Sequence, residues 1–428
     1  METGWLLAIL LFFHIIPRNA AHIVGVSIGV GIGGGGVHVG VGVGNAGSGG
    51  GGDGGDGWMG GGINPRIPSG SSETDLKSAY TALQAWKSAI TDDPYKIMDT
   101  WVGSDVCSYK GVFCADSQDS DSGPVVAGID LNRANLQGTL VKELSAFKDM
   151  SLLHLNSNRF NGTVPDAFSD LISLHELDLS NNQLSGCFPK VVLDIPNLAY
   201  LDLRYNSFYG PIPEDLFNKK LDAIFLNNNQ FDGEIPQNLG NSPASVINFA
   251  NNKFSGELPV SLGLMGSKVR EILFLNNQLK GCIPQGIGLY SDVEVLDLSY
   301  NSLMGHVPDT ISCLEKLEVL NLGHNKLTGE LPDVVCSLRS LLNFTASYNF
   351  FSGYSEACSK LFFRNVGFDV SDNCIPGKGM QRPEPECSMI PSGSLSCLRI
   401  PAAQPLACGS LGDLLESNSS GPKLSSSP

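Results

Sequence analysis

One arrangement of apolar and polar positions recurs over most of the chain, between residues 126 and 376. Written around a fixed asparagine, it is L-x-L-x-x-N-x-L-x-G-x-I-P, and it returns every 23 to 25 residues. An earlier copy carries Ala134 at the asparagine position. A period of this length predicts one small folded unit per copy, with the units stacked on one another. The fixed asparagines are Asn158, Asn182, Asn206, Asn229, Asn252, Asn277, Asn301, Asn325, Asn349 and Asn373.

The letters of each copy predict one coil of a solenoid. The L-x-L part is typical of a short strand whose apolar residues, such as Leu177 and Leu179, point inward. Stacking joins these strands into one parallel sheet on a concave side. The asparagine amide can bond backbone groups that would otherwise be buried without partners. The remaining residues predict 3₁₀ or irregular turns on a convex side. About eleven copies over residues 123–376 therefore predict an α/β solenoid, a leucine-rich repeat arc.

Strand positions between the inward residues face the concave side, where a partner can bind. Acids recur at these positions, and aromatic rings lie among them. Rings suit interface anchors, and carboxylates favour Lys and Arg on a partner. The competing interpretation is an ordinary solvated sheet face. The predicted ligand-binding residues are Asp178, Tyr200, Asp202, Arg204, Tyr205, Phe225, Asp297 and Tyr300.

The charge balance narrows the class of partner. The 428 residues include 43 acids and 27 Lys or Arg, which gives a net charge of -16. Nucleic acid is not an expected partner, because phosphate binding needs a basic surface. A cationic partner fits the electrostatics better.

The spacings predict no enzyme, no metal site and no cofactor. The histidines of the repeats lie in different coils, so no Ser-His-Asp or metal-ligand cluster forms. Asp178 and Asp202, on neighbouring strands, could imitate the carboxylate pair of a glycosidase. Like charges on an open face, however, lack the cleft that shifts pKa values.

The segments before the repeats have other compositions. Residues 1–21 hold a short apolar run and predict a signal peptide. No later apolar run has membrane length, so no membrane span is expected in the mature chain. Residues 22–70 are Gly-rich and are predicted to be disordered.

Caps are expected at both ends of the repeats, because a solenoid exposes its apolar core there. Residues 71–122 predict an N-terminal cap with a helix: Ser72 and Asp75 resemble a capping box, and Asp93-Pro94 ends the pattern. Residues 377–408 predict a Cys-rich C-terminal cap, and residues 409–428 a disordered Ser-rich tail. The apolar face of the helix is Leu76, Tyr80, Leu83, Trp86 and Ile90.

Eleven cysteines without a C-x-x-C pair, behind a signal peptide, indicate disulfides in an oxidising compartment. Cys107 and Cys114 are close enough in sequence for a local bridge. Neighbouring coils allow two further pairs, Cys282 with Cys313 and Cys336 with Cys358. The last four cysteines leave three connectivities open; they are Cys374, Cys387, Cys397 and Cys408.

Cys187 is the candidate free thiol. It lies four coils from Cys282, about 19 Å, which exceeds the reach of a disulfide. Both an inert cysteine and an intermolecular bridge fit this position. Sequons predict glycosylation at Asn161, Asn343 and Asn418.

Several segments resemble plant leucine-rich repeat extensins. Residues 82–114 (ALQAWKSAITDDPYKIMDTWVGSDVCSYKGVFC) look like the N-terminal cap of that family. Gly281-Cys282-Ile283-Pro284, Asn343-Phe344-Thr345, and residues 373–377 with Gln381-Arg382-Pro383 are also similar. The resemblance covers about residues 75–408. Only a short tail without a Ser-Pro-Pro run follows, so the chain resembles the short form that lacks the extensin tail.

The resemblance implies a plant-type arc with disulfide caps at both ends, a role at the cell wall, and homodimers. It also implies binding of small basic peptide hormones, the rapid alkalinization factors. We therefore expect a secreted, extracellular cell-wall protein that binds a basic peptide or protein, or a wall polysaccharide. Its expected role is in wall assembly or integrity signalling. The alternatives are an inhibitor of wall-degrading enzymes such as polygalacturonase, and a structural wall protein.

Overall fold

The computed structural model describes residues 27–33, 36–42, 72–117, 123–265, 269–289 and 292–389. The predicted signal peptide, the Ser-rich tail, Cys397, Cys408 and Asn418 lie outside these ranges. The chain forms two compact units, residues 1–66 and 67–428, which are described separately.

Two strands are described within the Gly-rich segment of the first unit. Strands β1 (Ser27–Gly33) and β2 (Gly36–Gly42) pair as an antiparallel hairpin. Val and Ile alternate with Gly in both strands, and β-branched residues favour extended backbone. The sequence prediction weighed the glycine content and missed this alternation.

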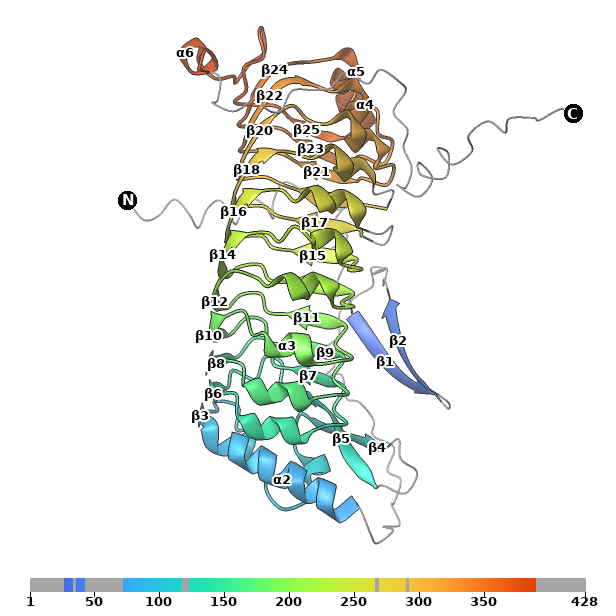
Figure 1. Ribbon diagram of the computed structural model, residues 1–428, viewed down its shortest axis with the longest axis vertical. Helices are drawn as coiled ribbons and strands as arrows, with labels where there is room; N and C mark the ends of the chain where they lie inside the picture. Colours follow the sequence, from blue (N-terminus) through green and yellow to red (C-terminus); the bar gives the residue numbers. More distant parts are fainter. Residues whose placement is uncertain are drawn as a thin grey trace, which may run out of the picture. The chain divides into compact units, whose positions relative to one another are not determined.

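The second unit is a stack of coils, as Figure 1 shows. Each coil gives one short strand to a twelve-stranded concave sheet, in which all strands are parallel except β4. The parallel leucine-rich repeat solenoid predicted from the sequence is therefore confirmed. The strands of the concave sheet are β4 (Val112–Asp116), β5 (Pro124–Asp130), β7 (Leu152–His154), β9 (Glu176–Asp178), β11 (Tyr200–Asp202), β13 (Ala223–Phe225), β15 (Val246–Asn248), β17 (Glu271–Leu273), β19 (Val295–Asp297), β21 (Val319–Asn321), β23 (Asn343–Thr345) and β25 (Gly367–Asp369).

A second sheet of eleven strands was not predicted. It forms from the x-L-x-G residues after each asparagine, where an inward leucine such as Leu184 again alternates with polar neighbours. The glycine that follows takes a positive φ, for example +77° at Gly233, and turns the chain out of the strand. Its strands are β3 (Ile90–Asp92), β6 (Gln137–Thr139), β8 (Arg159–Gly162), β10 (Gln183–Cys187), β12 (Ser207–Gly210), β14 (Gln230–Glu234), β16 (Lys253–Glu257), β18 (Gln278–Cys282), β20 (Ser302–Gly305), β22 (Lys326–Leu331) and β24 (Phe350–Tyr354).

Short helical turns complete the coils on the convex side. Their buried apolar residues, with those of both sheets, form one continuous core from Ala79 to Val366. The 3₁₀ turns are η1 (Met98–Thr100), η2 (Val106–Ser108), η3 (Lys142–Ala146), η4 (Asp166–Asp170), η5 (Glu214–Asn218), η6 (Leu239–Asn241), η7 (Val260–Leu264), η8 (Gln285–Leu289), η9 (Asp309–Cys313) and η10 (Phe362–Arg364). The α-helices are α2 (Ser72–Ala89), α3 (Val191–Asp194), α4 (Asp333–Cys336), α5 (Glu356–Ser359) and α6 (Glu384–Cys387).

The asparagine ladder joins each coil to the one before it. Asn349 is completely buried, and its Oδ1 accepts the backbone N–H of Leu327 at 2.9 Å. Its Nδ2 donates to the carbonyl of Leu322 in the preceding coil and to the carbonyl of Ala346 in its own coil. This pattern recurs from Asn158 to Asn373. One amide per coil thus satisfies backbone groups that the stack buries.

The N-terminal cap is built on α2. The helix ends at Ala89, earlier than Asp93-Pro94 suggested, and Ile90 belongs to β3, which pairs with Gly138 of β6. A Cβ at Gly138 would lie 2.4 Å from the carbonyl of Ala89, so this close approach requires glycine. The side chains of the predicted capping box lie outside the described residues. Trp86 is buried, and a Cys107–Cys114 disulfide closes the cap.

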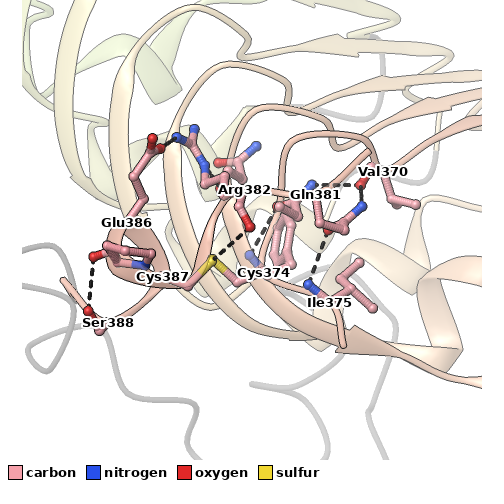
Figure 2. The surroundings of a disulfide bond; sticks show 12 residues. Val370, Cys374, Ile375, Gln381, Arg382, Glu386, Cys387 and Ser388 are labelled. Atoms are coloured by element: carbon pink, nitrogen blue, oxygen red, sulfur yellow. Dashed lines mark hydrogen bonds and ion pairs between the residues drawn. A yellow bond between two sulfur atoms is a disulfide. The ribbon is translucent and has the colours of Figure 1, made fainter. Parts of the chain in front are cut away.

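The C-terminal cap continues the ladder with a glutamine (Figure 2). Gln381 Oε1 accepts the N–H of Ile375 at 3.1 Å, and its Nε2 donates to the carbonyl of Val370 at 3.0 Å. These two groups lie one repeat after Phe351 and Ala346, which Asn373 bonds in the same way. Gln381 therefore supplies one more rung without a full coil, beside the Cys374–Cys387 disulfide.

We expect Gln381→Ala to loosen this cap. The N–H of the buried Ile375 loses its partner, which should lower the free energy of unfolding by about 1–2 kcal/mol. Urea unfolding and amide exchange of residues 370–389 measure the effect. Met380→Ala, at an exposed neighbouring position, is the control. Equal stability of the two variants would show that Gln381 is not a rung.

Candidate ligand-binding face

Three neighbouring strands bring most of the predicted binding residues together. Strands β9, β11 and β13 pair in register, so that Asp178, Asp202 and Phe225 lie side by side. Tyr200 begins β11, and Arg204 follows it. Asp297 and Tyr300 lie three coils beyond Phe225, about 14 Å away. The structure therefore holds one cluster and a separate acid on the same sheet.

Asp202, one of the predicted ligand-binding residues, is not open to solvent. Its side chain has no exposed surface. The Arg204 guanidinium lies 3.0 Å from its Oδ2, and the Tyr200 hydroxyl donates to the same oxygen at 3.2 Å. Asp202 thus holds Arg204 and Tyr200 in place, beneath the surface that a ligand would meet.

The buried carboxyl has an altered proton affinity. Burial, with the Asp178 carboxylate adding to it, raises the pKa of Asp202 to about 7, although Arg204 acts in the opposite direction. Burial also raises the pKa of Tyr200, as do Asp202 and Asp178. The pKa of Asp202 therefore departs from the ordinary value expected on an open sheet face. A glycosidase pair is still excluded at this point, because no substrate atom can reach the covered carboxyl of Asp202.

The exposed part of the cluster is the Arg204 guanidinium, which packs against an aromatic pair. The Arg204 guanidinium lies 5.0 Å from the centre of the Phe225 ring, and the rings of Tyr200 and Phe225 are 5.7 Å apart. Arg204 remains 36% exposed, and the Asp202 carboxyl beside it balances its charge only in part near neutral pH. The local surface is therefore closer to neutral than the sequence suggested.

Other acids of the sheet differ in their partners. Glu176 is buried and pairs with His154 at 3.0 Å. Burial lowers the pKa of His154, but the hydrogen bond and charge of Glu176 outweigh it and the pKa is raised overall. Within the described coils, no cation lies at ion-pair distance from Asp178 or Asp297. Among the acids predicted to bind a ligand, these two half-buried carboxylates are the ones available to a basic partner.

Each available acid is oriented by its own coil. Asp178 accepts the N–H and the hydroxyl of Ser180, and Asp297 accepts the same groups of Ser299. Asn321 also donates to Asp297 at 3.1 Å. Burial raises the pKa of Asp297, although these hydrogen bonds oppose the shift.

Tyr205 and Tyr300 do not lie on the strands. Each sits in the turn after its strand, with φ near +54°, and is about half exposed. Tyr300 stacks on His324, a contact that sequence reasoning missed. Its signal was the recurrence of rings directly before the ladder asparagines at Tyr300, His324 and Tyr348.

The remaining predicted sites are distributed along the stack. The structure joins Cys336 to Cys358, and Cys282 and Cys313 are also disulfide-bonded. Cys187 is an exposed free thiol. Of the two described sequon asparagines, Asn343 is exposed on β23 and Asn161 is half-buried on β8.

The part of the chain that the structure describes holds neither a candidate metal-binding cluster nor a candidate membrane-spanning helix. No group of three or more His, Cys, Asp or Glu there could hold a metal ion. No described helix combines the length and apolar character that a membrane crossing requires.

Comparison with known proteins identifies the family. Residues 149–208 and 271–349 match the leucine rich repeat model, and residues 76–115 match the leucine rich repeat N-terminal domain. Leucine-rich repeat extensin-like protein 7 of Arabidopsis thaliana is 61% identical over 322 residues, which cover 75% of this chain and 73% of that protein. The chain belongs to the leucine-rich repeat extensin-like family.

Other members of the leucine-rich repeat extensin-like family differ in length. Protein 6 of Arabidopsis is 50% identical, with 80% of this chain and 72% of the relative covered. Protein 2 is also 50% identical over 322 residues, but these span 75% of this chain and only 41% of the relative. The chain thus corresponds to nearly three quarters of some members and to less than half of others.

Solved structures with this fold bind different ligands. A TDR receptor has a TM-score of 0.56 and 30% identity, over 58% of this chain and 43% of its own. The Arabidopsis receptor kinase HAESA, in complex with the peptide hormone IDA and the co-receptor SERK1, has a TM-score of 0.55 and 26% identity, over 69% and 53%. A plant ice-binding protein has a TM-score of 0.56 and 25% identity, over 72% and 96%. The fold therefore serves binding but does not define the ligand.

Proposed function

We propose that this extensin-like chain is a secreted cell-wall protein that binds a basic peptide or protein on its concave sheet. The ligand would be of the rapid alkalinization factor class, and binding would act in wall assembly or integrity signalling. The observation that carries the proposal is the pair of oriented carboxylates without cationic partners, Asp178 and Asp297, with the Tyr200–Phe225 rings between them. HAESA, of the same fold, was solved with a peptide hormone.

The ligand contacts follow from the burial of each group. Asp178 and Asp297 would pair with Lys or Arg of the ligand, and the rings of Tyr200 and Phe225 would anchor its apolar part. Asp202 would act through Arg204 and Tyr200. Arg204 itself would repel a cation, so it favours a ligand whose positive charges flank an uncharged middle.

Substituting both available acids should weaken binding. We expect Asp178→Asn with Asp297→Asn to lower the affinity for a synthetic basic peptide of this class roughly three- to thirtyfold, because two partly exposed charge pairs are lost. The salt dependence of Kd should also become shallower. Isothermal titration at two salt concentrations measures both quantities.

A charge-matched variant separates the site from the overall charge. Asp166→Asn with Asp215→Asn removes two exposed acids from the 3₁₀ turns η4 and η5. It should retain the affinity of the parent. Equal loss in both double variants would mean that only net charge matters and would refute a binding site on the concave sheet.

We also propose that copies of the chain pair, as the family resemblance implies. The exposed Cys187 thiol offers a covalent link. Mass measurement of the parent and of Cys187→Ser, with and without reductant, tests this. Monomers under all conditions would contradict pairing, whereas a dimer that persists in Cys187→Ser would assign it to a non-covalent contact.

A further inference from the structure

The residue before each ladder asparagine takes an unusual backbone conformation. From Ser157 to Asp372, this position has φ between +50° and +60° in every coil. Asparagine, aspartate and histidine visit this left-handed region more readily than other side chains, but a tyrosine there is an outlier that costs energy. Tyr300, His324 and Tyr348 occupy it in three successive coils. Rings at this position in three successive coils therefore indicate a function that offsets the cost in backbone energy.

These side chains form two ladders that meet end to end. In the first, Asn251 donates to the side-chain oxygen of Asn228 at 3.0 Å, and Asn276 donates to that of Asn251 at 2.8 Å. In the second, the His324 ring lies 4.0 Å from both Tyr300 and Tyr348, within 13° of parallel. We name this row the amide–ring strip; it consists of Asn228, Asn251, Asn276, Tyr300, His324 and Tyr348.

The strip is a neutral track on an acidic protein. Five of its six residues carry an uncharged amide or hydroxyl group. The sixth is His324, and burial lowers the pKa of its imidazole, so that the ring is neutral near pH 7. The residues directly before the three rings are small and buried; they are Ser299, Gly323 and Ser347. These residues therefore do not cover the rings. Tyr300 and Tyr348 are 46% and 43% exposed. Neither a basic peptide nor an acidic polymer would find a counter-charge on these six side chains.

The chemistry of the strip selects a neutral ligand rich in hydroxyl groups. Amides and phenols donate and accept hydrogen bonds, and the edges of stacked rings are electropositive and attract oxygen atoms. The coils repeat about every 4.8 Å, similar to the length of one sugar ring in an extended chain. We propose that the amide–ring strip binds a neutral, β-linked polysaccharide that runs along the stack, about one sugar per coil.

Gel electrophoresis of the full chain through a soluble neutral polysaccharide tests the site. We use xyloglucan as the neutral polymer and polygalacturonate as the charged one. Xyloglucan should retard the parent protein, equally at low and high salt. Tyr300→Ser with Tyr348→Ser should weaken this association roughly tenfold, because both ring contacts to His324 are lost.

Two further variants make the result decisive. Tyr95→Ser with Tyr209→Ser removes two exposed tyrosines outside the strip and should behave as the parent. Tyr300→Phe with Tyr348→Phe keeps the stack and should fall between parent and serine variant. Absence of retardation by xyloglucan, equal retardation of the serine variant, or salt-sensitive retardation by polygalacturonate alone would overturn the proposal. Asp178→Asn, at an acid of β9 outside the strip, should keep the retardation by xyloglucan, which separates this site from the acids of the concave sheet.

Discussion

Asn349→Ala is expected to lower the free energy of unfolding by about 2–4 kcal/mol. The completely buried amide bonds the N–H of Leu327 and the carbonyl of Leu322, both in the preceding coil. Alanine leaves the N–H without a partner and opens a void. Because each coil is stabilised mainly by its neighbours, the loss weakens the whole coil contact and not one bond alone.

Chemical denaturation and amide exchange measure the effect of Asn349→Ala. Exchange should speed up most in the coils on either side of the ladder position. Gln278→Ala is the matched control, because this exposed amide side chain lies at the start of β18 and outside the ladder. We expect it to change stability by less than about 0.5 kcal/mol. A similar small change for Asn349→Ala would contradict the assigned role of the ladder.

Features that repeat in every coil were predictable from the sequence. The period, the inward leucines and the bonding role of the asparagines each follow from local rules. The second sheet also repeats, but its x-L-x-G strands lie directly against the ladder turn, and the glycine suggested a bend instead of a strand. The hairpin β1–β2 was missed for the same reason, since glycine content outweighed the Val and Ile alternation.

Features that occur in only some of the coils were not predictable. The polar position of Asp202 looks like that of Asp178, yet Arg204 and Tyr200 cover one and not the other. Gln381 takes the place of a ladder asparagine at a spacing that breaks the period, so no pattern search finds it. The ring stack needs three coils in register. In each case the decisive contact comes from a residue type that only some coils carry at that position.

Asp202→Asn is expected to stabilise the protein above neutral pH. The pKa of Asp202 is about 7 in the folded chain and near 3.8 when unfolded, so the folded chain keeps a proton that the unfolded chain has lost. Its contribution to stability is full below about pH 4 and is lost as the pH rises through 7. The difference corresponds to about 4 kcal/mol. Asparagine, with the same shape, has no proton to lose, so the variant should match the parent near pH 4 and exceed it near pH 8.

Thermal and urea unfolding at pH 4.5, 6 and 8 test this difference. His154 and Asp297 also have raised pKa values, so the parent should lose stability with rising pH even apart from Asp202. The comparison of parent and variant at each pH isolates Asp202. Asp166→Asn, at an exposed acid of η4, should follow the parent at every pH. Parallel curves for the parent and Asp202→Asn would show that Arg204 keeps the buried carboxyl ionised at every pH tested. The assignment of a proton to Asp202 in the folded chain would then be wrong.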